Sequence, residues 1–282
     1  MERDIITVYC LIDEYLKLAG IKDDVRAEIS NAEVLLIGYM AVNDFNGNYF
    51  KAHQYVKMMH LVKEIDYTRF LRRLVKINNV LSTLFLFLGS LFQRLNGAKI
   101  YSVDSFPVEL CQITRQSRVR LWSDPSLKGY NASKGRFFYG LKVHMVVTTD
   151  KEPVMVHISE GSIHDVTAGY QFMHYLPQKS ITIGDKGYVS SKLEAFLKQF
   201  EIVLSPIGRN NMQQENKEEY FTKRRIRKGV ETAFSMITAK FGKVIKATTI
   251  GGFLTKLRLF ITAYAINCFL KLSDDKKALL FN

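Results

Sequence analysis

The chain has 282 residues, 47% of them apolar, which is enough to bury a full hydrophobic core in one large or two ordinary domains. Its formal charge of +13 is uneven, because residues 1–95 carry 12 Lys and Arg against 11 Asp and Glu, whereas residues 96–282 carry 28 against 16. This excess predicts a polyanionic partner, nucleic acid before an anionic membrane surface. The three cysteines are far apart and form no CxxC pair, which argues against a structural zinc site and indicates free thiols.

Targeting and membrane signals are weak. The opening residues Met1-Glu-Arg-Asp place no basic stretch before an apolar one, so we expect no signal peptide. The longest apolar runs, 80–92 and 259–270, are shorter than the roughly 18–20 residues of a membrane span and are interpreted as buried helices. We therefore expect a cytoplasmic protein with no membrane partner.

The first 95 residues show helical periodicity with few β-branched runs, in four segments: 6–16, 31–40, 53–65 and 67–93. Asn96-Gly97 marks a break, after which the apolar period changes from about 3.6 towards 2. We expect an all-helical domain over 1–95 and a second domain over 96–282.

The second domain is predicted to be α/β. We expect its elements in the order β-β-β-α-β-α-β, which predicts a mixed sheet flanked by helices. The expected strands are 98–106, 137–149, 153–160, 180–184 and 201–205, with helices at 165–176 and 190–200. A polar, basic loop is expected over 107–136 and a second polar loop over 208–222, followed by helices at 230–241 and 253–272.

Two aspartates follow apolar, strand-like runs: Lys99-Ile-Tyr-Ser-Val-Asp104 and, 81 residues later, Ile181-Thr-Ile-Gly-Asp185. Reactive groups in α/β sheets gather where buried strands end. Since Mg²⁺ prefers oxygen ligands, and two-metal phosphoryl transfer needs carboxylates that converge from separate elements, both are candidate metal ligands. The competing interpretation is that each is a turn residue at the end of its strand.

A third candidate acid, Glu231, lies 46 residues after Asp185. An apolar stripe at helical spacing surrounds it, made of Val230, Phe234, Ile237 and Phe241. Polar and basic residues stand three, four or seven positions away: Arg224, Arg227, Lys228, Ser235 and Thr238. If the helix extends back past Gly229, the acid and the cations share one face, either for metal and phosphate or as ordinary ion pairs on a solvated face. Glu218 and Glu219 are the other candidates for the third acid.

Five short motifs occur in order: Tyr101-Ser-Val-Asp104-Ser-Phe-Pro, Gly140-Leu-Lys-Val-His-Met, Gly161-Ser-Ile-His-Asp165, Ile183-Gly-Asp185-Lys-Gly-Tyr188 and Val230-Glu231-Thr-Ala-Phe-Ser. Over nearly the whole chain they resemble the DDE transposases of bacterial insertion sequences, most closely the insertion-sequence 982 family. The resemblance implies an RNase H-like core, a mixed five-stranded sheet flanked by helices and preceded by the helical domain. It also implies that Asp104, Asp185 and Glu231 are catalytic and hold two Mg²⁺ ions, for which Mn²⁺ is a possible substitute.

Basic residues interleaved with aromatic ones suit contact with the DNA backbone and stacking on bases. The candidate DNA-binding residues are Arg115, Arg118, Arg120, Lys134, Arg136, Lys186, Lys223, Arg224, Arg225, Arg227 and Lys228. The loop over 107–136, which also holds Trp122 and Tyr130, could instead be a solvated insertion, and Lys186 could be a turn lysine. We interpret His144 as a satisfied core residue. Asp165 either lies near the catalytic end or caps a helix.

The sequence thus predicts a transposase that binds the terminal inverted repeats of its element and target DNA, as a homodimer on double-stranded DNA. It is expected to catalyse Mg²⁺-dependent strand cleavage and strand transfer by a two-metal mechanism, in the bacterial cytoplasm in association with the nucleoid. The alternatives are a catalytically silent DNA-binding regulator and an RNase H-like nuclease without strand transfer.

Overall fold

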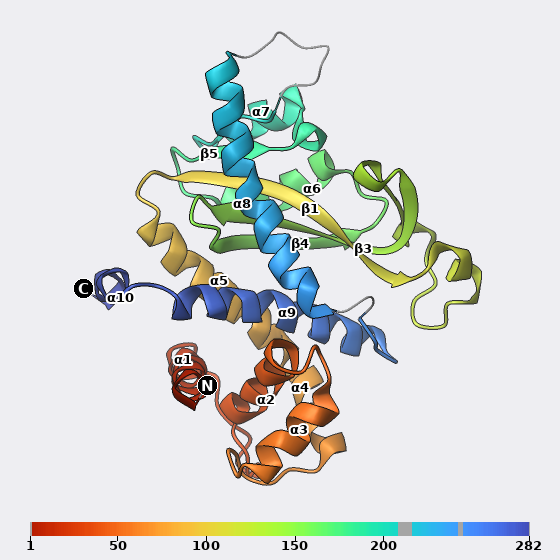
Figure 1. Ribbon diagram of the computed structural model, residues 1–282, viewed down its shortest axis with the longest axis vertical. Coiled ribbons are helices and arrows are strands. Elements are labelled where there is room, and N and C mark those ends of the chain that lie inside the picture. The colour runs from red at the N-terminus through yellow and green to blue at the C-terminus, as the bar shows by residue number, and fades with distance from the viewer. Residues whose placement is uncertain (1, 208–215, 242–244, 282) are drawn as a thin grey trace. The chain divides into compact units, whose positions relative to one another are not determined.

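The computed structural model describes residues 2–207, 216–241 and 245–281 (Figure 1). The chain forms two compact units. The helical unit comprises residues 1–88 and 237–274, and the sheet unit comprises residues 89–236 and 275–282. Position 95, where the sequence predicts a domain boundary, is the last residue of the helix α5 (Asn78–Leu95).

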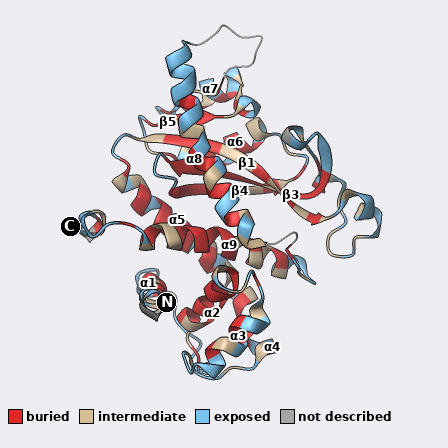
Figure 2. Cartoon of the chain, viewed as in Figure 1, coloured by how far each residue is buried: buried red, intermediate tan, exposed pale blue. Residues whose placement is uncertain are grey.

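The helical unit is built from α1 (Glu2–Leu18), α2 (Asn31–Asn43), α3 (Tyr49–Met58), α4 (Tyr67–Lys76), the first part of α5 (Asn78–Leu95), and α9 (Ile250–Leu270). The run expected over 67–93 is two helices, α4 and α5, which meet at a 55° bend. α2 is buried on almost every side (Figure 2). At Gly38 an added methyl group would lie 3.1 Å from Leu259, so the glycine allows α2 and α9 to pack closely.

α9 is long and apolar enough to span a membrane by length and composition. However, 67% of its most apolar stretch is buried inside the protein, as expected for the core helix of a globular protein. Its polar groups also have partners within the helical unit. Tyr39 Oη donates a hydrogen bond of 2.8 Å to Asn267 Oδ1, and Thr262 Oγ1 donates one of 3.2 Å to the carbonyl of Leu81. These contacts fit a helix that belongs to the core of the helical unit.

The sheet unit contains a mixed sheet of six strands, where the sequence predicts five. The strands are β1 (Ile100–Cys111), β2 (Lys128–Asn131), β3 (Arg136–Thr148), β4 (Pro153–Glu160), β5 (Ile181–Gly184) and β6 (Val203–Leu204). β1 pairs antiparallel with β3 and parallel with β5, and β5 pairs parallel with β6. The other edge of β3 pairs first with β2 and then with β4.

The predicted loop over 107–136 is therefore wrong in two places. β1 continues through Pro107 to Cys111, and Pro107 lies opposite Lys142 of β3. Since β5 pairs only with residues 100–103 of β1, the proline lies where one edge of β1 is free, which is where a strand tolerates it. The extra strand, β2, lies inside the same segment. It is only four residues long and has no apolar alternation that would mark it.

Helices cover both faces of the sheet (Figure 1). α8 (Lys217–Phe241) crosses one face, where Phe234 contacts Phe106 of β1 with ring centroids 4.6 Å apart. α6 (Asp165–Phe172) packs on the opposite face, where Phe172 stacks on His157 of β4 at 5.7 Å. The unit also contains α7 (Ser191–Lys198) and α10 (Asp274–Phe281). Asp104 lies on β1 and Asp185 directly follows β5. These two strands are neighbours in the sheet.

Residues 112–137, which we call the basic arm, extend from the end of β1 to the start of β3 (Figure 1). Three glycines meet where the arm joins the sheet. A methyl group added to Gly129 would collide with the carbonyl of Gly161, and one added to Gly161 would lie 2.8 Å from the carbonyl of Gly140. One added to Gly140 would collide with the carbonyl of Val108. The root of the arm is therefore a place where backbone packs directly on backbone.

Candidate active site

Asp104 lies on β1 and faces α8. Its neighbours in the strand, Tyr101, Ser102 and Val103, are fully buried, which places the carboxylate at the edge of the core. The Ser105 backbone N–H donates a hydrogen bond of 2.7 Å to Asp104 Oδ1. Burial raises the pKa of Asp104 to about 7, although this hydrogen bond lowers it, and the negative charge of Asp185 raises it further. The charge of Arg227 lowers the pKa of Asp104, but burial outweighs it, so the carboxyl group holds its proton more tightly than an exposed aspartate does.

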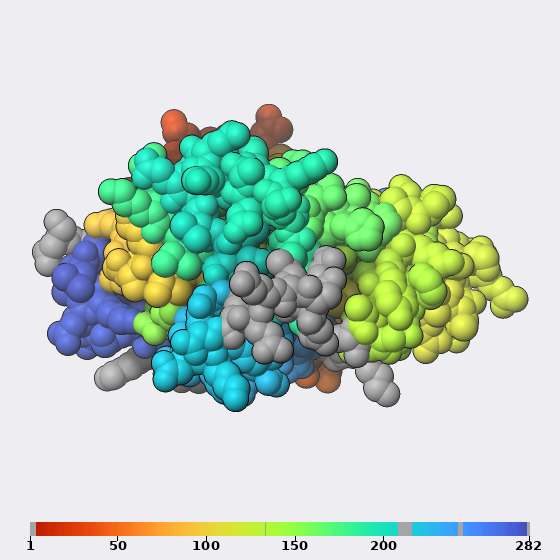
Figure 3. Space-filling view, turned by 90° about the horizontal axis from the view of Figure 1, so that it is seen from above, coloured from red at the N-terminus to blue at the C-terminus, as the bar shows by residue number. Residues whose placement is uncertain are grey.

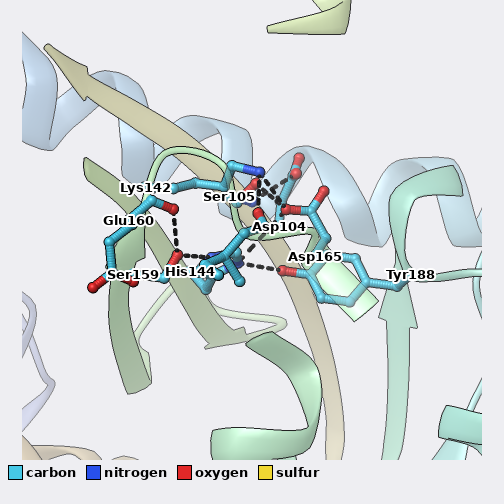
Figure 4. A network of polar contacts seen from close by, with 9 residues as sticks. Asp104, Ser105, Lys142, His144, Ser159, Glu160, Asp165 and Tyr188 are labelled. Carbon is cyan, nitrogen blue, oxygen red and sulfur yellow. Dashed lines mark hydrogen bonds and ion pairs between the residues drawn. The ribbon is translucent and has the colours of Figure 1, made fainter. Parts of the chain in front are cut away.

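Asp185 follows β5 and begins a short 3-10 turn, Lys186–Tyr188. Tyr188 is fully buried and anchors this turn to β3, because its hydroxyl lies 3.2 Å from His144 Nδ1 (Figure 4). His144 Nε2 lies 3.0 Å from Ser159 Oγ, which donates onward to the carbonyl of Glu160. This order of bonds fits a neutral imidazole that carries its proton on Nε2 and accepts from Tyr188.

The neutral state of His144 has a physical cause. Burial, with smaller contributions from Lys142 and His157, lowers the pKa of His144 to about 3. The prediction that His144 is a satisfied core residue is confirmed, since it is fully buried and both ring nitrogens have partners. The chain of bonds from Tyr188 to Glu160 fixes the turn that carries Asp185.

Glu231 lies in the middle of α8, which extends back past Gly229 to Lys217. The polar loop expected over 208–222 is therefore wrong from Lys217 onward, and residues 208–215 lie outside the described parts. The buried stripe predicted for this helix is present in Val230, Phe234 and Ile237. Phe234 of this stripe packs α8 on Phe106 of β1, and Glu231 lies beside the stripe, where it meets Arg227.

The guanidinium of Arg227 joins the three acids. Its Nη1 lies 3.4 Å from Asp104 Oδ2 and 3.3 Å from Asp185 Oδ1, and its Nη2 lies 2.6 Å from Glu231 Oε1. The Arg227 Nε is buried without a hydrogen-bond partner in the described parts of the chain, so these ion pairs hold the guanidinium. We call the three acids and Arg227 the carboxylate cluster. Glu218 and Glu219 are exposed near the start of α8, and Glu219 pairs with Lys223 at 2.9 Å.

Within the described ranges, no three His, Cys, Asp or Glu side chains are arranged to hold a metal ion. The cluster nevertheless fits a divalent cation in chemistry. Its donors are carboxylate oxygens, which Mg²⁺ prefers, and they already surround a positive group. Three formal negative charges stand against one positive charge, so a cation would relieve repulsion that the guanidinium leaves in place.

A second polar group lies beneath the cluster, on the α6 side of the sheet (Figure 4), and it contains Asp165, as one of the two interpretations of this residue predicted. Asp165 Oδ1 accepts a hydrogen bond of 3.0 Å from Ser105 Oγ and lies 3.3 Å from Lys142 Nζ. Asp165 is therefore not the cap of α6, because His164 holds that position and the Asp165 side chain turns to the sheet. A methyl group added to Gly187 would lie 2.5 Å from Asp165 Oδ2, so the Asp185 turn packs against this carboxylate. In the sequence, the motif Gly161-Ser-Ile-His-Asp165 is the feature that indicated a position for Asp165 near the cluster.

The predicted DNA-binding residues fall into two sets. The first lies on the basic arm, which projects from one side of the sheet unit in two perpendicular views (Figures 1 and 3): Arg115, Arg118, Arg120, Lys134 and Arg136. Arg136 pairs with Glu109 at 2.6 Å. The second lies in and near the carboxylate cluster: Lys186, Lys223, Arg224, Arg225, Arg227 and Lys228. Of these, Lys223 is buried and Arg227 belongs to the cluster, whereas Arg224, Arg225 and Lys228 are exposed.

Residues 96–268, more than half of the chain, match the family model described as the transposase DDE domain. One solved structure, the cryo-EM structure of the piggyBac transposase synaptic complex with hairpin DNA, is similar over 98% of this chain and 76% of that chain. Its sequence identity is 11% and the TM-score is 0.44, and a likeness of this size carries no functional argument. No curated protein matches the chain.

Proposed function

This chain belongs to the family of transposases with a DDE domain, and we propose that it cleaves DNA strands at the ends of its element and joins them to target DNA. The observation that carries the proposal is the meeting of Asp104, Asp185 and Glu231 on one guanidinium, although they come from β1, the end of β5 and α8. Elements far apart in sequence converge here on one charged site beside a basic surface. Such convergence is what phosphoryl transfer on a polyanion requires.

We assign Asp104, Asp185 and Glu231 as the ligands of two Mg²⁺ ions, with Mn²⁺ as a possible substitute. Bound divalent ions would supply activation of the attacking oxygen and stabilisation of the leaving oxygen. The protein's own groups position the ligands. The Ser105 N–H orients Asp104, the bond from Tyr188 to His144 orients the Asp185 turn, and Arg227 orients Glu231. Positioning and electrostatics then carry the reaction without a covalent protein–DNA intermediate.

The finer assignments belong to the same proposal. The sheet order, with β1 central and β5 and β6 parallel to it, supports an RNase H-like core to which β2 has been added. We further propose membership of the insertion-sequence 982 group, binding of terminal inverted repeats, and a homodimer on DNA. Residues 1–95 form the proposed end-binding or dimerisation domain and residues 96–282 the catalytic domain.

Three substitutions that remove charge without changing shape test the proposal: Asp104→Asn, Asp185→Asn and Glu231→Gln. Each should lower Mg²⁺-dependent cleavage of DNA carrying the element's end by at least about 10³-fold. Affinity for the same DNA, measured in EDTA, should stay within about threefold. Glu218→Gln, an exposed acid on the same helix, is the matched control and should keep full cleavage.

The outcomes separate the candidate functions. Full cleavage by any of the three variants would remove that residue from the site. Cleavage without joined products would favour a nuclease, and DNA binding without cleavage by the wild-type protein would favour a regulator.

A further inference from the structure

An exposed pair of aromatic rings stands on the basic arm. Tyr130 of β2 and Phe137 of β3 are directly opposite each other in the antiparallel register. Their ring centroids are 5.1 Å apart at an interplanar angle of 61°. The two residues are 54% and 53% exposed. Since aromatic side chains of this kind bury roughly 150–250 Å² in a core, a sizeable apolar surface is left in water here.

The charge around these rings is strongly positive. The basic arm holds six cations and one acid: Arg115, Arg118, Arg120, Lys128, Lys134, Arg136 and Asp124. Asp124 is committed to the backbone, because it accepts a hydrogen bond of 2.8 Å from the Ser126 N–H. Among the described residues, Arg136 alone of the six cations has a carboxylate partner. The residues of the arm therefore carry a net charge of +5, and outside the arm only Glu109, which pairs with Arg136, offsets part of it among the described ion pairs.

One cation is already placed at the rings. Lys128 Nζ lies 5.2 Å from the centroid of the Phe137 ring. Cations that follow a nucleic-acid backbone, set beside aromatic faces that receive bases, are the arrangement by which proteins hold unpaired nucleotides. Bases stacked inside a duplex do not offer their faces, so a pair of rings suits a base that has left the helix. In protein–protein interfaces lysine is depleted around such apolar cores, whereas here Lys128 lies over the Phe137 ring.

We propose that Tyr130 and Phe137 form a stacking platform that binds an unpaired base of DNA, while the cations of the basic arm hold the flanking phosphates. This inference rests on the proposed function for its choice of DNA. It adds that the substrate includes a base outside the double helix. The platform is separate in residues from the carboxylate cluster, so binding by the platform can be measured without cleavage.

The test uses the full chain in EDTA and a duplex that carries one bulged 2-aminopurine, whose fluorescence falls when the base stacks on an aromatic ring. Tyr130→Leu with Phe137→Leu keeps apolar bulk but removes both rings. It should abolish the quenching and weaken binding of the bulged duplex by about 5- to 150-fold. Affinity for the fully paired duplex should change less than about threefold.

Two controls decide whether stacking is the cause. Tyr130→Phe with Phe137→Tyr keeps both rings and should keep the quenching. Tyr175→Leu removes a ring that is 68% exposed elsewhere in the sheet unit and should change nothing. The proposal is overturned if the leucine variant binds the bulged duplex as the wild-type does, or if the wild-type does not prefer the bulged duplex. A change in oligomeric state in the leucine variant, with unchanged DNA affinity, would show instead that the rings contact a second copy.

Failure here and failure of the proposed function give different results. If the platform is wrong, the acid variants still lose cleavage while the leucine variant retains binding of the bulge. If the transposase chemistry is wrong, the acid variants keep whatever cleavage is seen, and the result with the bulged duplex is unaffected.

Discussion

The carboxylate cluster and the basic arm, both in the sheet unit, differ in the sign and in the spacing of their charges. The cluster gathers three acids around one arginine, held by buried neighbours and by the turn that Tyr188 anchors. The arm spreads six cations over exposed turns with one acid among them. Each is only partly neutralised: Arg227 is one cation among three acids, and Glu109 pairs with one of the six cations of the arm. An acidic site that can bind metal ions and a basic surface that can bind nucleic acid thus lie on the same unit. This combination suits a metal-dependent reaction on nucleic acid.

The largest expected effect concerns the cluster without metal. The pKa of Asp104 is about 7 in the folded chain, raised mainly by burial from an ordinary value of 3.8. Since the folded protein binds this proton more tightly than the unfolded one, the wild-type protein loses stability as pH rises from about 4 to about 7. Asp104→Asn is neutral throughout and escapes this loss. In EDTA at pH 8 it should be more stable than the wild-type by up to about 4 kcal/mol, at about 1.36 kcal/mol per pH unit.

Urea unfolding at pH 4 and pH 8 measures this difference. At pH 4 the two proteins should be nearly equal. Addition of Mg²⁺ at pH 8 should stabilise the wild-type protein alone and narrow the gap, because a ligand stabilises the state that binds it. Parallel pH profiles for the two proteins would show that burial does not raise the pKa of Asp104.

Arg227→Gln should have the next largest effect. It removes the one cation among three carboxylates and should destabilise the metal-free protein at pH 8 by about 1–3 kcal/mol, since partly buried acids are left unpaired. Arg225→Gln, an exposed arginine two residues earlier in α8, is the control and should change stability by less than about 0.5 kcal/mol. Thermal unfolding in EDTA makes the comparison. Equal melting temperatures for the two variants would show that the guanidinium does not hold the acids together.

The smallest expected effect concerns the arm. Arg115→Gln, Arg118→Gln and Arg120→Gln together should lower affinity for a paired duplex about tenfold at about 0.1 M salt. They should also reduce the salt dependence of log K by about three, roughly one per phosphate contact. The control removes three exposed lysines elsewhere, Lys51→Gln, Lys192→Gln and Lys198→Gln. Salt titrations of binding should show the larger change in the arm variant. If both triple variants lose affinity equally, overall charge and not the arm governs binding.

The sequence located the strands that carry Asp104 and Asp185, but it did not predict the contacts that Arg227 makes with these two residues. Apolar runs before Asp104 and Asp185 located both strands, since burial on two faces leaves a strong local pattern. Arg227 had a visible local partner in Glu231, four residues away. Its contacts with Asp104 and Asp185 depend on how α8 crosses the sheet, and no spacing along the chain encodes that crossing.

The missed elements have a common cause, which is the lack of an apolar period. β2, with the sequence Lys128-Gly-Tyr-Asn, is held by its pairing to β3. The first turns of α8 are charged on nearly every side and gain support from ion pairs one turn apart, such as Glu219 with Lys223. The structure of such segments depends on tertiary contacts, which leave no local pattern. The sequence alone therefore predicts loops at these positions.

The glycine root of the arm has a consequence for tracing ancestry. Gly129, Gly140 and Gly161 lie where backbone meets backbone, and any side chain at these positions would push the strands apart. A chain that inherits the arm in this form must inherit all three glycines, whereas a chain that shares only the three acids is free to lose them. These positions therefore offer a signature by which descendants with the same arm can be distinguished from more distant kin that retain the chemistry alone.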